Sequence, residues 1–116
     1  MSMIKVLCGG RFNFLHKGHE YFLRKAKEYG FLVVVIAHDV HNFKKQEKKQ
    51  MEERKRQIER LGIADKVLIG DSKDFFKVVL KEKPQIIALG WDQTLPFPES
   101  MLKGKVKVVK IGKTEI

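Results

Sequence analysis

Two histidines three residues apart, His16 and His19, are the side chains in this sequence best suited to chemistry on a phosphate. Positions three apart lie on the same side of a helical turn, so both imidazoles can point at one ligand. Gly18 between them leaves room for a ligand near the backbone. A lone histidine is more often a cap or a core residue, but this pair directly follows a turn that contains two glycines. The spacing therefore predicts a phosphate site with two imidazole donors.

The residues around this pair predict a strand, a turn and the start of a helix. An apolar run over Met3–Cys8 is typical of a buried strand, and apolar residues recur at helical spacing over His19–Tyr29. In a parallel α/β sheet such a junction lies at the carboxyl ends of the strands, where small ligands bind. The helix N-terminus adds free N–H groups and about half a positive charge, which attract an anion. The predicted apolar face of this helix consists of Phe22, Leu23, Ala26 and Tyr29.

The rest of the chain continues the alternation of strands and helices. The run Phe31–His38 lacks polar alternation, which is typical of a central parallel strand buried on both faces. Further strands are predicted at Lys66–Ile69, Gln85–Leu89 and Val106–Ile111. Further helices are predicted up to Gly62, from Phe75 to near Pro84 with Phe75, Phe76, Val79 and Leu80 at helical spacing, and over Glu99–Leu102. This order predicts an α/β fold in which a five-stranded parallel sheet carries helices on both faces.

Length and composition restrict the class of protein. A chain of 116 residues is expected to form a single domain over 1–116. Its one cysteine, Cys8, can form no internal disulfide, which favours a reduced, cytoplasmic setting. No apolar run approaches the ~20 residues of a membrane span, and no signal-peptide pattern opens the chain. The net charge of +10 raises the possibility of a polyanion partner without separating a nucleic acid from a nucleotide.

Charged residues dominate the segment Lys44–Arg60, where acidic and basic side chains are interspersed. This pattern is typical of an exposed helix supported by i,i+4 pairs, so most of its lysines are expected to face solvent. Just before it, His38, Asp39 and His41 could be taken for metal ligands. Three ligand types on one loop are a weak signal, and no metal site is predicted there.

The motif His16-Lys17-Gly18-His19, placed after a turn of glycines and an aromatic residue, resembles the signature of the nucleotidylyltransferase superfamily. Within this superfamily the chain is most similar to the small cytidylyltransferase-like enzymes and, among those, to the archaeal FAD synthases (FMN adenylyltransferases). A second match lies far along the chain, where an apolar strand is followed by Gly90, Trp91, Asp92 and Gln93.

The resemblance implies a Rossmann-like sheet of order 3-2-1-4-5, in which the two matching turns flank one crevice. It implies that His16 and His19 donate hydrogen bonds to the reacting phosphates, and that Lys44, with Lys45 as the alternative, and Arg54 neutralise phosphate charge. It further implies nucleotide contacts from Gly9, Gly10, Arg11, Phe12, Lys17, Gly18, Gly90, Asp92 and Gln93.

The activity implied by the resemblance is nucleotidyl transfer from a nucleoside triphosphate to a phosphorylated acceptor, with release of pyrophosphate. ATP and FMN are the first expected substrates, with Mg²⁺ or another divalent cation accompanying the nucleotide. The alternatives are a cytidylyltransferase acting on glycerol 3-phosphate or a similar phosphoalcohol, and a nucleotide-binding protein with weak or no catalysis. A nucleic-acid binder is motivated only by the net charge and the basic run. The resemblance also suggests a homodimer.

One departure from the family pattern lies inside the first motif. The family turn usually reads Gly, Thr, Phe, Asp, whereas this chain has Gly10, Arg11, Phe12 and Asn13. Arg11 adds a permanent charge beside the phosphates, and Asn13 removes a carboxylate. Either these substitutions adapt the site to another phosphorylated acceptor, or the protein binds a nucleotide and catalyses poorly.

Overall fold

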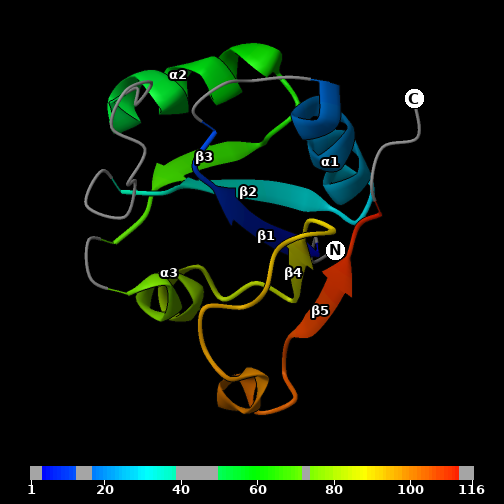
Figure 1. Cartoon of the computed structure of the whole chain (residues 1–116). Coiled ribbons are helices and arrows are strands. Elements are labelled where there is room, and N and C mark those ends of the chain that lie inside the picture. Colours follow the sequence, from blue (N-terminus) through cyan, green and yellow to red (C-terminus); the bar gives the residue numbers. More distant parts are fainter. Residues whose placement is uncertain (1–3, 13–16, 39–49, 72–73, 113–116) are drawn as a thin grey trace.

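The computed structural model describes residues 4–12, 17–38, 50–71 and 74–112. The five strands form one parallel sheet in the order β3-β2-β1-β4-β5, which confirms the expected topology (Figure 1). The elements follow the chain as β1 (Lys5–Gly10), α1 (Lys17–Lys27), β2 (Phe31–Ile36), α2 (Met51–Leu61), β3 (Lys66–Ile69), α3 (Phe75–Glu82), β4 (Ile86–Leu89), the 3-10 helix η2 (Glu99–Leu102) and β5 (Lys107–Lys110).

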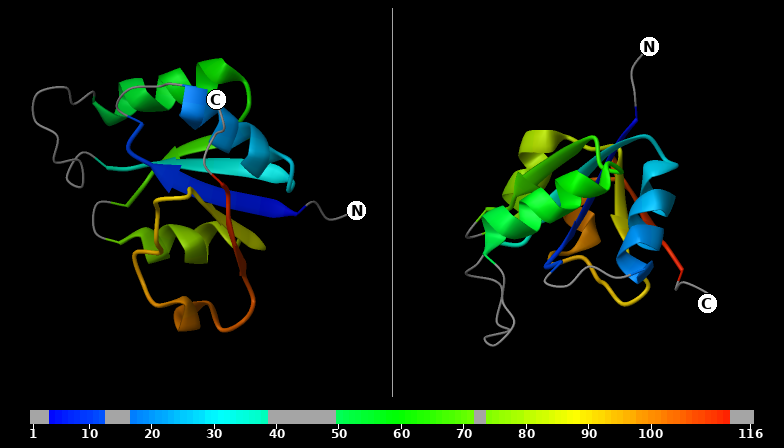
Figure 2. Two further views of the ribbon diagram at one scale, coloured as in Figure 1. Left: turned by 45° about the vertical axis from the view of Figure 1, so that its right-hand side comes forward. Right: turned by 90° about the horizontal axis from the view of Figure 1, so that it is seen from above.

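Helices cover both faces of the sheet, as expected. Figure 1 and the turned views of Figure 2 show α1 and α2 on one face, with α3 and η2 on the other. Alternation along β1 divides its side chains between the two cores. Val6 and Cys8 pack with α1 and α2, whereas Leu7 packs with α3. The sheet therefore buries one apolar layer on each side.

Strand β2 is the centre of this arrangement. Every residue from Leu32 to Ile36 is buried, because β2 lies between β1 and β3 and both of its faces are covered by helices. This confirms the prediction of a central parallel strand. The registers are unequal on the two sides of β1. It pairs with β2 along all of Lys5–Gly10, but with β4 only where Val6 and Leu7 meet Ile86 and Ile87.

Some predicted bounds and core positions are wrong. Strand β1 continues to Gly10 instead of ending at Cys8, so the two glycines belong to the strand. Helix α1 begins at Lys17 and ends at Lys27, which leaves Tyr29 beyond the helix and 41% exposed. Leu80 is 59% exposed because it faces away from the sheet on α3. Phe75 and Phe76 both contact the Phe97 ring and pack against the core layer under α3. The described part of the charged run is α2, an amphipathic helix whose Ile58 is buried.

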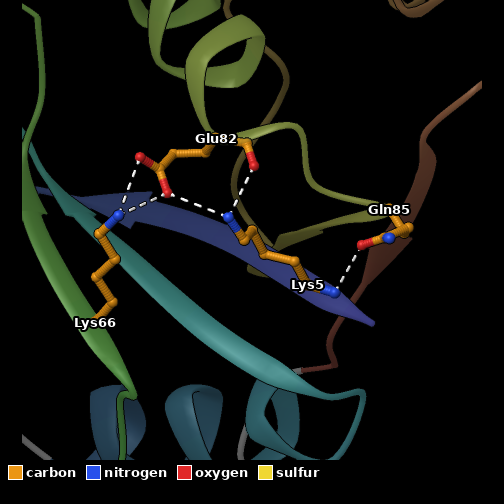
Figure 3. Close-up of polar contacts among 4 residues, drawn as sticks. All are labelled: Lys5, Lys66, Glu82 and Gln85. Carbon is orange, nitrogen blue, oxygen red and sulfur yellow. Dashed lines mark hydrogen bonds and ion pairs between the residues drawn. The ribbon is translucent and has the colours of Figure 1, made fainter. Parts of the chain in front are cut away.

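A polar cluster closes the amino ends of the strands (Figure 3). Glu82, the last residue of α3, accepts hydrogen bonds from Lys66 on β3 and forms an ion pair with Lys5 on β1 at 3.6 Å. The Lys5 ammonium also donates to the Glu82 carbonyl at 2.9 Å. The Lys5 N–H donates to Oε1 of Gln85, just before β4, at 2.7 Å. This cluster anchors α3 at the end of the sheet opposite the predicted crevice.

Candidate active site

The side-chain amide of Gln93 joins the carboxyl ends of β1 and β4. Its Oε1 accepts a hydrogen bond from the Gly90 N–H at 2.7 Å, and its Nε2 donates to the Gly9 carbonyl at 2.9 Å. The two turns that were expected to flank one crevice therefore lie side by side. They do so where the strand order reverses direction, with β2 on one side of β1 and β4 on the other.

Arg54 on α2 is fully buried, and its guanidinium holds the backbone next to the first turn. One terminal nitrogen donates to the Arg11 carbonyl at 2.6 Å and the other to the Ala37 carbonyl at 2.8 Å. Arg11 follows β1 and Ala37 follows β2, so one side chain connects the ends of both strands. A buried guanidinium requires such acceptors, because burying an unpaired charge is very costly. These contacts give Arg54 a structural role, and its predicted contact with phosphate stays a prediction.

Phe12 shapes the turn between β1 and α1. Its φ of 52° lies in the left-handed region, and its side chain is only 5% exposed. That conformation costs roughly 1–2 kcal/mol for a residue with a Cβ, so the buried contacts of the ring must hold it. The ring meets the His19 imidazole edge to face, with the centroids 5.3 Å apart. The predicted phosphate ligand His19 therefore rests against a fixed aromatic ring.

Close contacts restrict side chains at two glycines, Gly10 at the end of β1 and Gly90 after β4. A Cβ at Gly10 would lie 2.9 Å from the Phe12 ring, and a Cβ at Gly90 would lie 3.3 Å from Oε1 of Gln93. A side chain at Gly10 would push Phe12 out of its buried position. At Gly90 it would crowd the amide that joins β1 to β4. Side chains at these two positions would therefore have to displace Phe12 or shift the amide of Gln93.

Cationic groups and a helix N-terminus surround the first turn. Lys17 opens α1 and is exposed, Arg11 is exposed beside β1, and the charge of Arg54 lies beneath them. Helix α1 has 11 residues, so its N-terminal N–H groups and dipole add to this positive field. An anion such as a triphosphate would be attracted to this end of the sheet.

The second turn exposes its polar and aromatic residues. Asp92 is open to solvent, and Trp91 is 55% exposed. Trp91 lies beyond the end of β4 and outside both core layers. Nucleotide contacts of Asp92 stay a prediction.

Several predicted residues lie outside the described part of the chain. These are His16 and Lys44, the alternative Lys45, and the substituted position Asn13. Within the described ranges, no three His, Cys, Asp or Glu side chains lie close enough together to hold a metal ion. In the same ranges, no helix is long and apolar enough to cross a membrane.

Cys8 lies in β1 close to the crevice but takes no part in it. The thiol is buried, and this burial raises its pKa to about 12. Such a thiol stays protonated at neutral pH, so it is a poor nucleophile and a poor metal ligand.

The structural roles of Arg54 and Gln93 were not predicted from the sequence. Arg54 lies on the same helical face as Met51, Ile58 and Leu61, and this spacing could have indicated that its side chain points inward. No sequence pattern indicates the contacts of Gln93, because its partner Gly9 is brought to it only by the pairing of β1 with β4.

Comparison with known proteins agrees with this geometry. The cytidylyltransferase-like family model matches residues 7–115, a range that contains both turns. A FAD synthase from Ferroglobus placidus is 41% identical over 108 residues, covering 90% of this chain and 69% of its own length. A FAD synthase from Archaeoglobus profundus is 36% identical over 107 residues, with 90% and 68% covered. The crystal structure of a protein described as the lipopolysaccharide core biosynthesis protein from Thermoplasma volcanium is 36% identical, with a TM-score of 0.84, covering 98% of this chain and 100% of its own.

Proposed function

The chain belongs to the cytidylyltransferase-like family, and we propose that it transfers the adenylyl group of ATP to FMN, forming FAD and releasing pyrophosphate. The observation that carries the proposal is the 41% identity with a FAD synthase over 108 residues. The proposal is also supported by the hydrogen bonds of Gln93, which hold the two turns side by side at the switch point of the sheet.

The reaction needs positioning and charge compensation more than proton transfer. A phosphate oxygen of FMN attacks the α-phosphorus of ATP in line, and the bond from that phosphorus to the oxygen bridging to the β-phosphate breaks. Phosphate monoesters have a second pKa of about 6, so the attacking oxygen is already ionised at neutral pH. The leaving pyrophosphate takes the electron pair of the broken bond. No side chain has to act as a general base.

We assign the roles of the site residues from this chemistry. His16 and His19 donate hydrogen bonds to the phosphates, and Phe12 fixes the orientation of the His19 ring. Lys44 neutralises charge that develops on the pyrophosphate. Arg54 holds the turn through the Arg11 carbonyl while its charge strengthens the local positive potential.

The nucleotide contacts belong to the same proposal. Its phosphates lie along the first turn and the N-terminus of α1, and its nucleoside lies against the second turn. A divalent cation, most simply Mg²⁺, arrives with the triphosphate. The residues assigned to these contacts are Gly9, Gly10, Arg11, Phe12, Lys17, Gly18, Gly90 and Asp92.

A substrate panel tests the proposal. The protein is incubated with Mg²⁺ and either ATP or CTP, together with FMN, glycerol 3-phosphate or phosphopantetheine, and the products are identified by mass spectrometry. FAD from ATP and FMN is the expected product. A CDP-alcohol in place of FAD would support the cytidylyltransferase alternative, to which the family model points. Stabilisation by nucleotide without pyrophosphate release would indicate a binding protein.

The proposal also includes the oligomeric state and the cellular location of the enzyme. We expect a homodimer working in the cytoplasm, where a reduced Cys8 persists. Light scattering coupled to size-exclusion chromatography measures the oligomeric state, and a monomer at micromolar concentration would contradict the dimer.

A further inference from the structure

Strand β1 pairs with β2 over a longer stretch than with β4. Its in-register pairs with β2 continue to Gly10, whereas its pairs with β4 end at Leu7. Successive carbonyls of a strand point to opposite sides. The Gly10 carbonyl accepts the Ala37 N–H on the β2 side, so the Gly9 carbonyl faces β4. Toward the crevice, the regular ladder between β1 and β4 has therefore ended.

The Gln93 amide occupies this end of the ladder. It accepts from the N–H of Gly90, directly after β4, and donates to the carbonyl of Gly9 on β1. A carboxamide carries the same donor and acceptor as a peptide group. Gln93 thus acts as a peptide unit inserted between two strands, and its length sets their separation.

We propose that Gln93 is a positioning residue that sets the width of the crevice between the two substrate-binding turns through its bonds to Gly9 and Gly90. This inference rests on the proposed adenylyl transfer. Each end of the amide makes one hydrogen bond of normal length to a backbone group, and these two bonds fix the orientation of the side chain between the strands. A Cβ at Gly90 would lie 3.3 Å from Oε1 of Gln93, so a side chain there would press on the same amide.

The chain contains a matched control at the other end of the same two strands. Oε1 of Gln85 accepts the Lys5 N–H at 2.7 Å, so it also links β1 to the β4 segment through a backbone group (Figure 3). Gln85 lies at the amino ends of the strands, away from the crevice. Gln93→Ala and Gln85→Ala therefore remove similar links, and only the first should alter the reaction.

The decisive experiment compares wild type, Gln93→Ala and Gln85→Ala in steady-state FAD formation from ATP and FMN. We expect Gln93→Ala to lower kcat by about 10- to 100-fold while the KM for ATP changes less than about threefold, because misplaced substrates react slowly even when bound. Gln85→Ala should keep kcat within about twofold. In parallel, hydrogen exchange of the Gly90 amide, followed by NMR, should accelerate in Gln93→Ala and stay unchanged in Gln85→Ala.

The outcomes separate the possible roles. A large rise in KM for ATP with unchanged kcat would overturn the inference in favour of a direct nucleotide ligand. Equal kcat values in the two variants would reduce Gln93 to a structural link. Wild-type protein that forms no FAD would contradict the proposed function, and unchanged Gly90 exchange in Gln93→Ala would overturn the inference whatever the substrate.

The variant Gln93→Glu adds a test that uses pH. An ionised carboxylate can accept from Gly90 but cannot donate to Gly9, whereas a protonated carboxyl group can do both. The Tm difference between wild type and Gln93→Glu should therefore narrow as the pH falls from 7 toward 4. A difference that stays constant or widens would contradict the donor role of the Gln93 amide.

Discussion

Lys66, at the start of β3, donates hydrogen bonds to both carboxylate oxygens of Glu82, at 3.2 and 3.3 Å. Glu82 is only 6% exposed, and it closes α3 on the opposite side of the sheet from α1 and α2. The pair, together with Lys5, fixes the helix to the amino ends of two strands. These contacts stabilise the fold and lie away from the crevice.

Replacing Glu82 should destabilise the fold without changing the reaction. Glu82→Ala leaves two ammonium groups without their carboxylate, and we expect a loss of about 1–3 kcal/mol in the free energy of unfolding. Urea unfolding measures this loss. Glu59→Ala is the control, because it removes an exposed i,i+4 pair with Lys55 and should cost less than about 0.5 kcal/mol. Equal losses in the two variants would show that the Glu82 cluster adds nothing beyond a surface pair.

Arg54 should be sensitive even to a substitution that keeps its charge. Arg54→Ala leaves the Arg11 and Ala37 carbonyls without their donor, and we expect a loss of about 2–4 kcal/mol. Arg54→Lys keeps a cation but cannot span both carbonyls, so FAD formation should fall by about tenfold or more. Urea unfolding and steady-state kinetics measure the two effects. Arg56→Ala, on the exposed side of α2, should leave both values unchanged. Full activity of Arg54→Lys would argue against the importance of the two contacts.

The histidines should affect turnover more than nucleotide binding. His16→Ala and His19→Ala each remove a donor to the reacting phosphates, which typically costs about 10²–10³ in kcat. Nucleotide affinity, measured by calorimetry, should change much less. His19→Ala should also lower Tm slightly because its ring packs on Phe12. If both variants turn over ATP and FMN at the wild-type rate, the assigned chemistry is wrong.

Asp65 should contribute stability that disappears in acid. Burial alone would raise the pKa of Asp65, but hydrogen bonds from the Lys27 ammonium and the Leu32 N–H, together with the Lys27 charge, hold it below the ordinary 3.8. A lowered pKa means that the contribution is present above pH 3.8 and is lost as the pH falls below it. The Tm of wild type should exceed that of Asp65→Asn at pH 6, by an amount that vanishes in strong acid. A constant difference would contradict the ionic origin.

Cys8 should resist thiol reagents in the native protein. With its pKa raised to about 12 by burial, only roughly one thiol in ten thousand is ionised at pH 8. An aromatic disulfide reagent should therefore label the native protein far more slowly than the protein unfolded in urea. Rapid stoichiometric labelling without denaturant would show that β1 opens readily.

The sequence by itself determined the order of elements and the place of the first motif. The unbroken apolar run of β2 predicts burial on both faces, and Gly62 ends α2 in the left-handed conformation that glycine adopts easily. The end of β1 was predicted incorrectly. Gly9 and Gly10 predict a turn by composition, but pairing with β2 keeps them in the strand.

Only the tertiary structure decided what Gln93, Arg54 and Phe12 contact. Gln93 and Arg54 donate to carbonyls of segments distant in sequence, and Phe12 is buried in the core layer that α1 and α2 share. Local propensity carries no information about those partners. The motifs thus identified the two halves of a crevice. The amide of Gln93, placed by the pairing of β1 with β4, determined how those halves are joined.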